Sequence, residues 1–107
     1  LGLLAAQRGD RAAAERLFRR ALDLGPDYSE ARTNLGRALR DQGREDEALS
    51  ELREAVRRNP EFGPARHALG ALLAKRGDRD GAAEQYEAAA ALDEDDADAR
   101  ANLAVLR

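Results

Sequence analysis

The sequence predicts an all-α protein built from helix-turn-helix repeats that stack into a solenoid. Small and apolar residues recur every 34 residues along the 107-residue chain, other apolar residues fall at helical spacing between them, and no segment alternates like a β-strand. The recurring positions are Leu1, Leu35, Leu69 and Leu103; Gly2, Gly36 and Gly70; Gly9, Gly43 and Gly77; Ala14, Ala48 and Ala82; Phe18, Leu52 and Tyr86; Ala21, Ala55 and Ala89; and Pro26 and Pro60, with Glu94 in place of a third proline. Such a period is typical of proteins in which each unit buries its apolar face against its neighbours.

The first helix of each unit is predicted to end at a glycine. Gly9, Gly43 and Gly77 stand at the same place in successive units, and glycine readily adopts the left-handed conformation that closes a helix. Asp10 and Asp78 follow two of these glycines. They are expected to cap the second helix, because a carboxylate accepts hydrogen bonds from the free N–H groups of a first turn.

The second helix of each unit is predicted to end before residues 25–27, 59–61 and 93–96. Pro26 and Pro60 lie in the first two of these segments, and proline lacks the N–H group needed to continue a helix. The expected helices cover residues 1–8, 11–24, 28–42, 45–58, 63–76, 79–92 and 97–107. Because the connections are short, consecutive helices are expected to pack antiparallel.

The composition indicates a modest core of leucine and alanine. The chain has two Phe, two Tyr, no Trp and no Met, and 36% of its residues are charged, with a net charge of -3. This balance gives no electrostatic reason to expect nucleic acid as a partner. The absence of cysteine excludes disulfides, thiolate catalysis and sulfur-ligated zinc. The apolar runs are far shorter than the roughly 18 residues that indicate a membrane span.

The source and compartment are indicated only indirectly. Lys75 is the sole lysine among 18 basic residues, which fits the codon usage of a GC-rich genome, so we expect a bacterial source. The chain begins on Leu1 without a methionine and is expected to be part of a longer protein. It does not open with the pattern of a signal peptide, and the cytoplasm is the favoured location.

The stretch from Ser29 to Pro60 resembles the consensus of the tetratricopeptide repeat, a helix-turn-helix unit of 34 residues. The resemblance extends over the whole chain, which is expected to be a single domain. In this frame residues 1–28 form a truncated first repeat, 29–62 the second repeat, 63–96 the third repeat and 97–107 the first helix of a fourth.

One position departs from the family pattern. Arg32, Arg66 and Arg100 stand at the fourth position of their units, which is commonly aromatic in the family. The stem of an arginine can still cover apolar surface while its guanidinium group stays in water. We therefore expect the repeats to form despite the loss of the aromatic ring.

The small landmark residues are expected to let the two helices of a unit approach closely. Gly36 is predicted to face Ala48, and Gly70 to face Ala82. A larger residue at Gly36 or Ala48 should therefore overpack the interior. Leu69 is predicted to lie in the core, so its truncation should leave a cavity.

The resemblance implies a right-handed superhelix whose concave face is lined by the first helix of each unit. The candidate partner-binding residues on this face are Thr33, Asn34, Arg37, Arg40, His67, Ala71, Lys75 and Asn102. Their mixture of positive charge and apolar space best suits an extended peptide with an acidic or carboxylate group. For any one of these polar residues, simple solvation is the commoner role, since charged side chains are mostly exposed.

Two asparagines carry an additional implication of the resemblance. Asn34 and Asn102 share the repeat position at which many family members place an asparagine that binds the backbone of the ligand, whereas Ala68 interrupts the series. Some chaperone-binding members clamp a C-terminal carboxylate with two Lys, two Asn and an Arg. Leu3 and Pro64 occupy places of that clamp here, so binding of a chaperone tail is disfavoured.

Neither catalysis nor a cofactor is predicted. His67 is the only histidine, and no second metal ligand lies at helical spacing from it. The hydroxyl groups of Ser29, Thr33 and Ser50 have no base at an informative spacing. The chain is therefore expected to be non-catalytic, without a metal site.

Three functions fit this sequence. The favoured one is a peptide-binding interaction module of a longer protein. The second is a scaffold that forms homo-oligomers, because solenoids need polar ends to stay monomeric and both ends here are apolar. The apolar end residues are Leu1, Leu3, Leu4, Leu103, Val105 and Leu106. The third is an accessory domain of an enzyme whose catalytic domain lies outside this segment.

Overall fold

The computed structural model describes residues 2–25, 27–92 and 97–106, and the side chains within 10–25, 27–92 and 101–105. The regular structure in these ranges is entirely α-helical. The helices are α1 (Gly2–Leu24), α2 (Ser29–Asp41), α3 (Glu45–Arg58), α4 (Gly63–Lys75), α5 (Arg79–Leu92) and α6 (Ala97–Leu106). The predicted all-α class is therefore confirmed.

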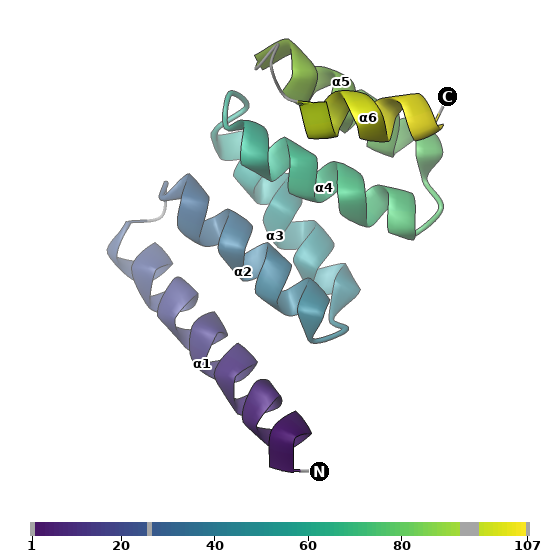
Figure 1. Ribbon diagram of the computed structural model, residues 1–107. Coiled ribbons are helices and arrows are strands. Elements are labelled where there is room, and N and C mark those ends of the chain that lie inside the picture. The colour runs from purple at the N-terminus through teal and green to yellow at the C-terminus, as the bar shows by residue number, and fades with distance from the viewer. Residues whose placement is uncertain (1, 26, 93–96, 107) are drawn as a thin grey trace.

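The helices stack as an open array of 41 × 34 × 23 Å. Each helix packs against the next one along the chain, and α2 also packs against α4. Figure 1 shows α1, α2 and α4 following one another along the array, with α3 and α5 behind α2 and α4. The first helices of two adjacent units, α2 and α4, therefore lie side by side and share one face of the molecule.

The predicted break at Gly9 is wrong, because residues 2–24 form one continuous helix. A left-handed turn stabilises the fold when it allows the helix before it to pack against the helix after it, as α2 does on α3. The segment before Gly9 is short, and glycine inside a helix costs only about 1 kcal/mol relative to alanine. Asp10 consequently lies within α1 and does not cap a helix.

The other two glycine turns form as predicted. Gly43 and Gly77 have φ angles of +79° and +87°, the left-handed conformation expected at these positions. In the first turn the Arg44 N–H donates to the Leu39 carbonyl at 2.9 Å, which satisfies one of the free carbonyls at the end of α2. In the second turn the Gly81 N–H donates to Asp78 Oδ1 at 2.9 Å, so Asp78 caps α5.

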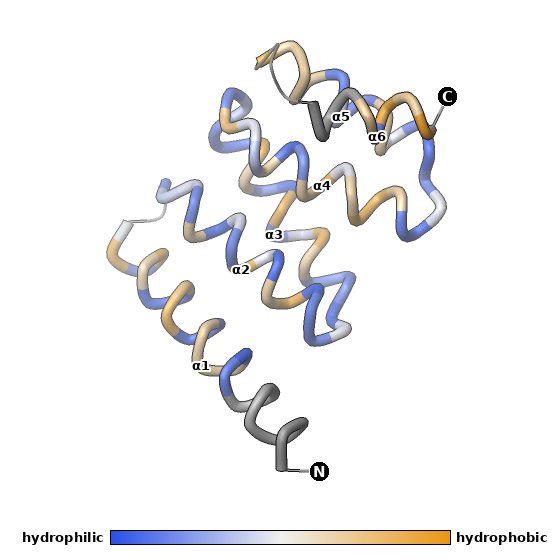
Figure 2. The backbone as a smooth tube through the Cα atoms, in the orientation of Figure 1, coloured by the Kyte–Doolittle hydropathy of each residue, from blue (hydrophilic) through white to orange (hydrophobic). Residues whose placement is uncertain are grey.

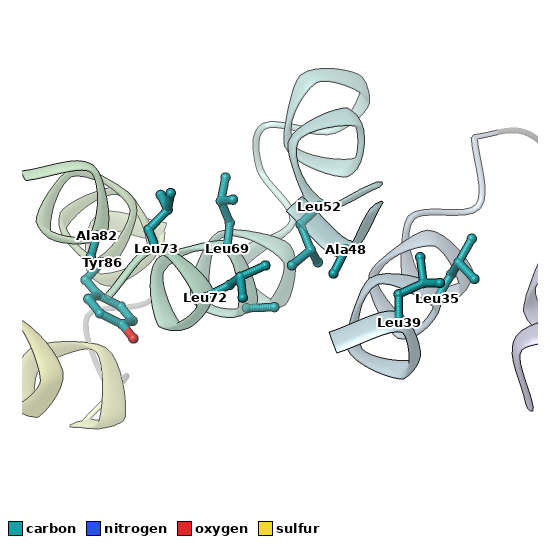
Figure 3. Close-up of a cluster of buried hydrophobic side chains, with 10 residues drawn as sticks. Leu35, Leu39, Ala48, Leu52, Leu69, Leu72, Leu73, Ala82 and Tyr86 are labelled. Carbon is teal, nitrogen blue, oxygen red and sulfur yellow. The ribbon is translucent and has the colours of Figure 1, made fainter. Parts of the chain in front are cut away.

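The core follows the landmark positions of the repeat. Its buried residues are Leu35, Leu39, Ala48, Leu52, Ala68, Leu69, Leu72, Leu73, Ala82 and Tyr86. Figure 3 shows these side chains as a continuous row that runs from α2 to α5. Figure 2 shows apolar residues distributed along α4, which packs against α2, α3 and α5. Leu69 is 3% exposed, as its predicted place in the interior requires.

The landmark glycines allow close approach, but their nearest partners differ from the prediction. A Cβ atom on Gly36 would lie 2.6 Å from Leu52 Cγ, whereas the Ala48 carbonyl oxygen would be 3.5 Å away. A Cβ atom on Gly70 would lie 3.0 Å from the ring of Tyr86. The large residue one turn after each landmark alanine therefore fills the space above the glycine, because side chains i and i+4 share a helix face.

The arginines that replace the family aromatic join the two helices of a unit by polar contacts. Arg32 Nη1 donates to Glu51 Oε2 at 2.9 Å. One repeat later, Arg66 Nη1 donates to Gln85 Oε1 at 3.2 Å. Each arginine thus contacts the residue 19 positions further on, across its helix pair. The side chain of Arg100 lies outside the described residues.

Ion pairs connect neighbouring units at their turns. Glu15 on α1 accepts hydrogen bonds from Gln42 Nε2 at 3.0 Å, from Arg19 Nε at 3.0 Å and from Arg44 Nη1 at 2.7 Å. These contacts, led by the one from Gln42, lower the pKa of Glu15. Salt bridges of this kind contribute about 0–1 kcal/mol each when they are exposed to solvent.

Stability is expected to fall in acid, because folding lowers the pKa of Glu15, Glu45, Glu47 and Glu54 below 4.5. Hydrogen bonds from neighbouring arginines lower the pKa of Glu54 to about 2. A carboxyl with a lowered pKa stabilises the fold above its unfolded pKa and loses that effect as the pH falls through its folded pKa. The free energy of unfolding in urea should therefore decrease between about pH 5 and about pH 2. Glu15→Gln should make this pH dependence shallower, whereas Glu61→Gln at an exposed site is the control and should leave it unchanged. A free energy of unfolding that stays constant over this pH range would contradict the expectation.

Candidate functional site

Two adjoining pockets lie on either side of α2. One, of about 310 Å³, is lined by Glu30, Thr33, Asn34 and Arg37 of α2 together with Phe62 and Pro64. The other, of about 340 Å³, is lined by Asp10, Arg11, Ala14 and Phe18 of α1 together with Asn34, Arg37, Ala38 and Asp41. Asn34 and Arg37 line both pockets, and we call the two pockets together the groove beside α2.

Arg37 differs from the other cations of the chain. Within the described side chains, the cations that make no hydrogen bond or ion pair are Arg16, Arg20, Arg37, Arg53 and Arg79. Arg37 alone in this set is half-buried, and the other four are exposed. A guanidinium group presents five N–H donors in a fixed fork that fits a carboxylate. Arg37 is therefore available to an anionic group in the groove.

Asn34 lies one turn before Arg37 on the same helix and is also half-buried. Its amide makes no hydrogen bond with any residue whose side chain is described. An amide side chain can both donate and accept, so it matches the N–H and C=O groups of a peptide backbone. Asn34 and Arg37 are both among the predicted partner-binding residues, and the structure places both at these two pockets.

Thr33 is buried, contrary to its predicted place among the accessible residues of the groove. It is 1% exposed, and its Oγ1 atom has no hydrogen-bond partner among the described residues. A hydroxyl group buried in this way costs about 1–3 kcal/mol. Helical spacing assigns a residue to a face of a helix, but it does not reveal how closely the neighbouring helix approaches, and here α4 packs directly against α2.

Two of the predicted cations are neutralised within the protein. Lys75 Nζ lies 2.8 Å from Glu45 Oε2, and Arg40 Nη2 lies 3.1 Å from Asp41 Oδ1. Neither cation lines the two pockets beside α2. Lys75 on α4 therefore pairs with a residue of α3 in the preceding repeat, and Arg40 pairs with the last residue of α2.

The remaining predicted residues form a separate cluster toward the C-terminus. Asn102 Nδ2 lies 3.4 Å from His67 Nε2, and the ring of His67 packs edge-on against Tyr86 at a centroid distance of 5.5 Å. Ala71 is half-buried against the core. The structure thus brings Asn102 to His67, and not to Asn34. The described residues contain no group of three or more His, Cys, Asp and Glu side chains that could hold a metal ion.

Phe62 was missed by the sequence-based prediction of the site. It is the last residue of its 34-residue unit, directly before α4, and it lines the pocket with Asn34 and Arg37. Tyr28 holds the same place one unit earlier. An aromatic residue repeated at the start of successive first helices was the signal that could have revealed it.

The fold and the groove define a helical-repeat solenoid, and comparisons with known proteins identify its family. Models of the tetratricopeptide repeat match residues 5–73 and residues 65–100. The chain belongs to the tetratricopeptide repeat family. A search of the curated proteins found no match. In the part of the chain that is described, no helix is both long and apolar enough to cross a membrane.

A solved structure supports the same fold. The chain superimposes with a TM-score of 0.84 on the first tetratricopeptide repeat domain of Spaghetti (RPAP3), which was solved bound to the HSP90 peptide SRMEEVD. The two sequences are 21% identical, and the match covers 98% of this chain and 83% of the other. At this identity the likeness establishes the fold alone.

Proposed function

We propose that the chain is a non-catalytic protein-interaction module that binds an extended peptide segment in the groove beside α2. The observation that carries the proposal is the half-buried Arg37 beside the amide of Asn34, neither of which has a partner among the described residues. A carboxylate of the ligand would bind Arg37, and the ligand backbone would bind Asn34. The peptide-bound structure of the similar repeat domain adds support from the fold.

Selection from a library of random linear peptides tests this proposal. Peptides with a carboxylate should be recovered, and Arg37→Glu should raise their Kd about 10–100-fold, because a charge-assisted hydrogen bond contributes about 1.5–3 kcal/mol. The control is Arg53→Glu, which changes the net charge equally at an exposed arginine that pairs with no described residue. Unchanged binding by the first variant, with unchanged melting, would refute the groove as the binding site.

A second candidate function is self-association through apolar surface near the ends of the solenoid. Leu17 and Leu24 on α1 are 64% and 87% exposed, and Val105 on α6 is 85% exposed. If these surfaces pair, light scattering should report a mass that rises with protein concentration. A constant monomer mass up to high concentration would exclude this candidate. Nothing in the described residues favours the role of an accessory enzyme domain over these two.

A further inference from the structure

The pocket between α2 and the start of α4 carries unpaired charges of both signs. Glu30 lines this pocket at one end and Arg37 at the other, with Asn34 between them on the same helix. Neither Glu30 nor Arg37 forms an ion pair with a described residue. In the adjoining pocket, the carboxylate of Asp41 already accepts hydrogen bonds from Arg40. Glu30 and Arg37 are therefore both unpaired within the part of the chain whose side chains are described.

The spacing of these two residues along the axis of α2 matches one periodicity of an extended peptide. Glu30 and Arg37 are seven residues apart on a helix, which corresponds to about 10 Å along its axis. In the polyproline II conformation, side chains three residues apart lie on the same side and about 9 Å apart. In a β-strand, side chains on one side are about 7 Å or about 13 Å apart. A polyproline II segment with charges three residues apart therefore fits the spacing of Glu30 and Arg37 along α2 best.

The rest of the pocket suits the portion of the ligand between the two charges. The amide of Asn34 can hydrogen-bond to the backbone there. Phe62 and Pro64 form an apolar wall, and an aromatic ring is a common docking surface for polyproline II segments. The charges of Glu30 and Arg37 and the amide of Asn34 thus converge on one place.

We infer that the groove selects an extended segment in which an acidic and a basic side chain are three residues apart. This inference rests on the peptide-binding function proposed above and adds a second charged contact between the ligand and the groove. The acidic side chain binds Arg37, and the basic side chain binds Glu30. A purely acidic segment is disfavoured, because its second carboxylate meets Glu30. A nucleic acid strand is disfavoured for the same reason.

Four synthetic peptides of equal length, acetylated, amidated and rich in proline, test the inference by fluorescence anisotropy. One carries Lys and Glu three residues apart, one carries them two residues apart, one carries two Glu and one carries two Lys at the spacing of three. The first should bind about two- to fivefold more tightly than the two-Glu peptide and the peptide with the spacing of two, which lose a partly exposed ion pair. It should bind at least about tenfold more tightly than the two-Lys peptide, which loses the charge-assisted hydrogen bonds to Arg37. Equal binding of the two-Glu peptide, or no binding of any peptide, would overturn the inference.

Single charge reversals provide a sharper test, because they should switch the preference. Glu30→Lys should make the two-Glu peptide the tightest ligand, and Arg37→Glu should favour the two-Lys peptide. Glu61→Lys is the matched control, since Glu61 is exposed and lines neither pocket beside α2. If Glu30→Lys leaves the order of affinities unchanged while Arg37→Glu abolishes binding, the selection for opposite charges fails and the peptide-binding groove stands. If library peptides bind equally well after Arg37→Glu, the proposed function itself fails.

Discussion

Replacing Leu69 by alanine is expected to lower the free energy of unfolding by about 2–5 kcal/mol. Leu69 is 3% exposed on α4 and belongs to the central row of buried side chains. Truncation removes its apolar surface from the interior and leaves a cavity that the neighbouring helices can fill only in part. Because each repeat contacts only its neighbours, a defect in α4 weakens its contacts with α2, α3 and α5 together. Urea unfolding followed by circular dichroism measures the change.

The control for this substitution is Leu17→Ala. Leu17 is 64% exposed in the middle of α1, and alanine favours a helix slightly more than leucine does. Its replacement should change the free energy of unfolding by no more than about 0.5 kcal/mol. If the two substitutions had equal effects, the buried row would not be the source of stability.

The helix ends were predictable from the sequence where a glycine turn joins two helices that pack against each other. Gly43 ends α2 and Gly77 ends α4, since each glycine adopts a left-handed conformation and the next helix folds back on the previous one. Gly9 occupies the same place in the sequence pattern, yet α1 continues through it. A glycine permits a turn but does not require one. The turn forms only where the two helices that it joins can pack against each other, and the glycine alone does not reveal this.

Among the candidate site residues, the common placement of Asn34 and Arg37 at the two pockets was predictable. It follows from the period of the helix, which puts residues three apart on one face. The pairing of Lys75 with Glu45 was not predictable, because these residues are 30 positions apart and meet only through the stacking of repeats. The contact between His67 and Asn102 has the same origin. Whether a polar side chain is free for a ligand depends on such long-range contacts, which no local pattern records.

Replacing Gly36 by alanine is expected to destabilise the protein by about 1–3 kcal/mol, although alanine is the better helix former. The added Cβ atom would lie 2.6 Å from Leu52 Cγ and 2.7 Å from Leu52 Cδ2. Leu52 is 1% exposed and has little room to move. Ser50→Ala is the control, because Ser50 is exposed on α3 and alanine is the better helix former there as well. That substitution should be neutral or stabilising by up to about 0.5 kcal/mol.

The same substitution should change sign when Leu52 is first truncated. Leu52→Ala alone should cost about 2–5 kcal/mol through the cavity that it leaves. In that background the nearest remaining atom to the new Cβ is the Ala48 carbonyl oxygen at 3.5 Å, an ordinary contact. Gly36→Ala should then raise the free energy of unfolding by about 0.5–1 kcal/mol, the usual advantage of alanine over glycine in a helix. The double-mutant cycle isolates the contact between these two residues. If Gly36→Ala had the same effect in both backgrounds, Gly36 would not serve to accommodate Leu52, and the close packing of α2 on α3 would need another cause.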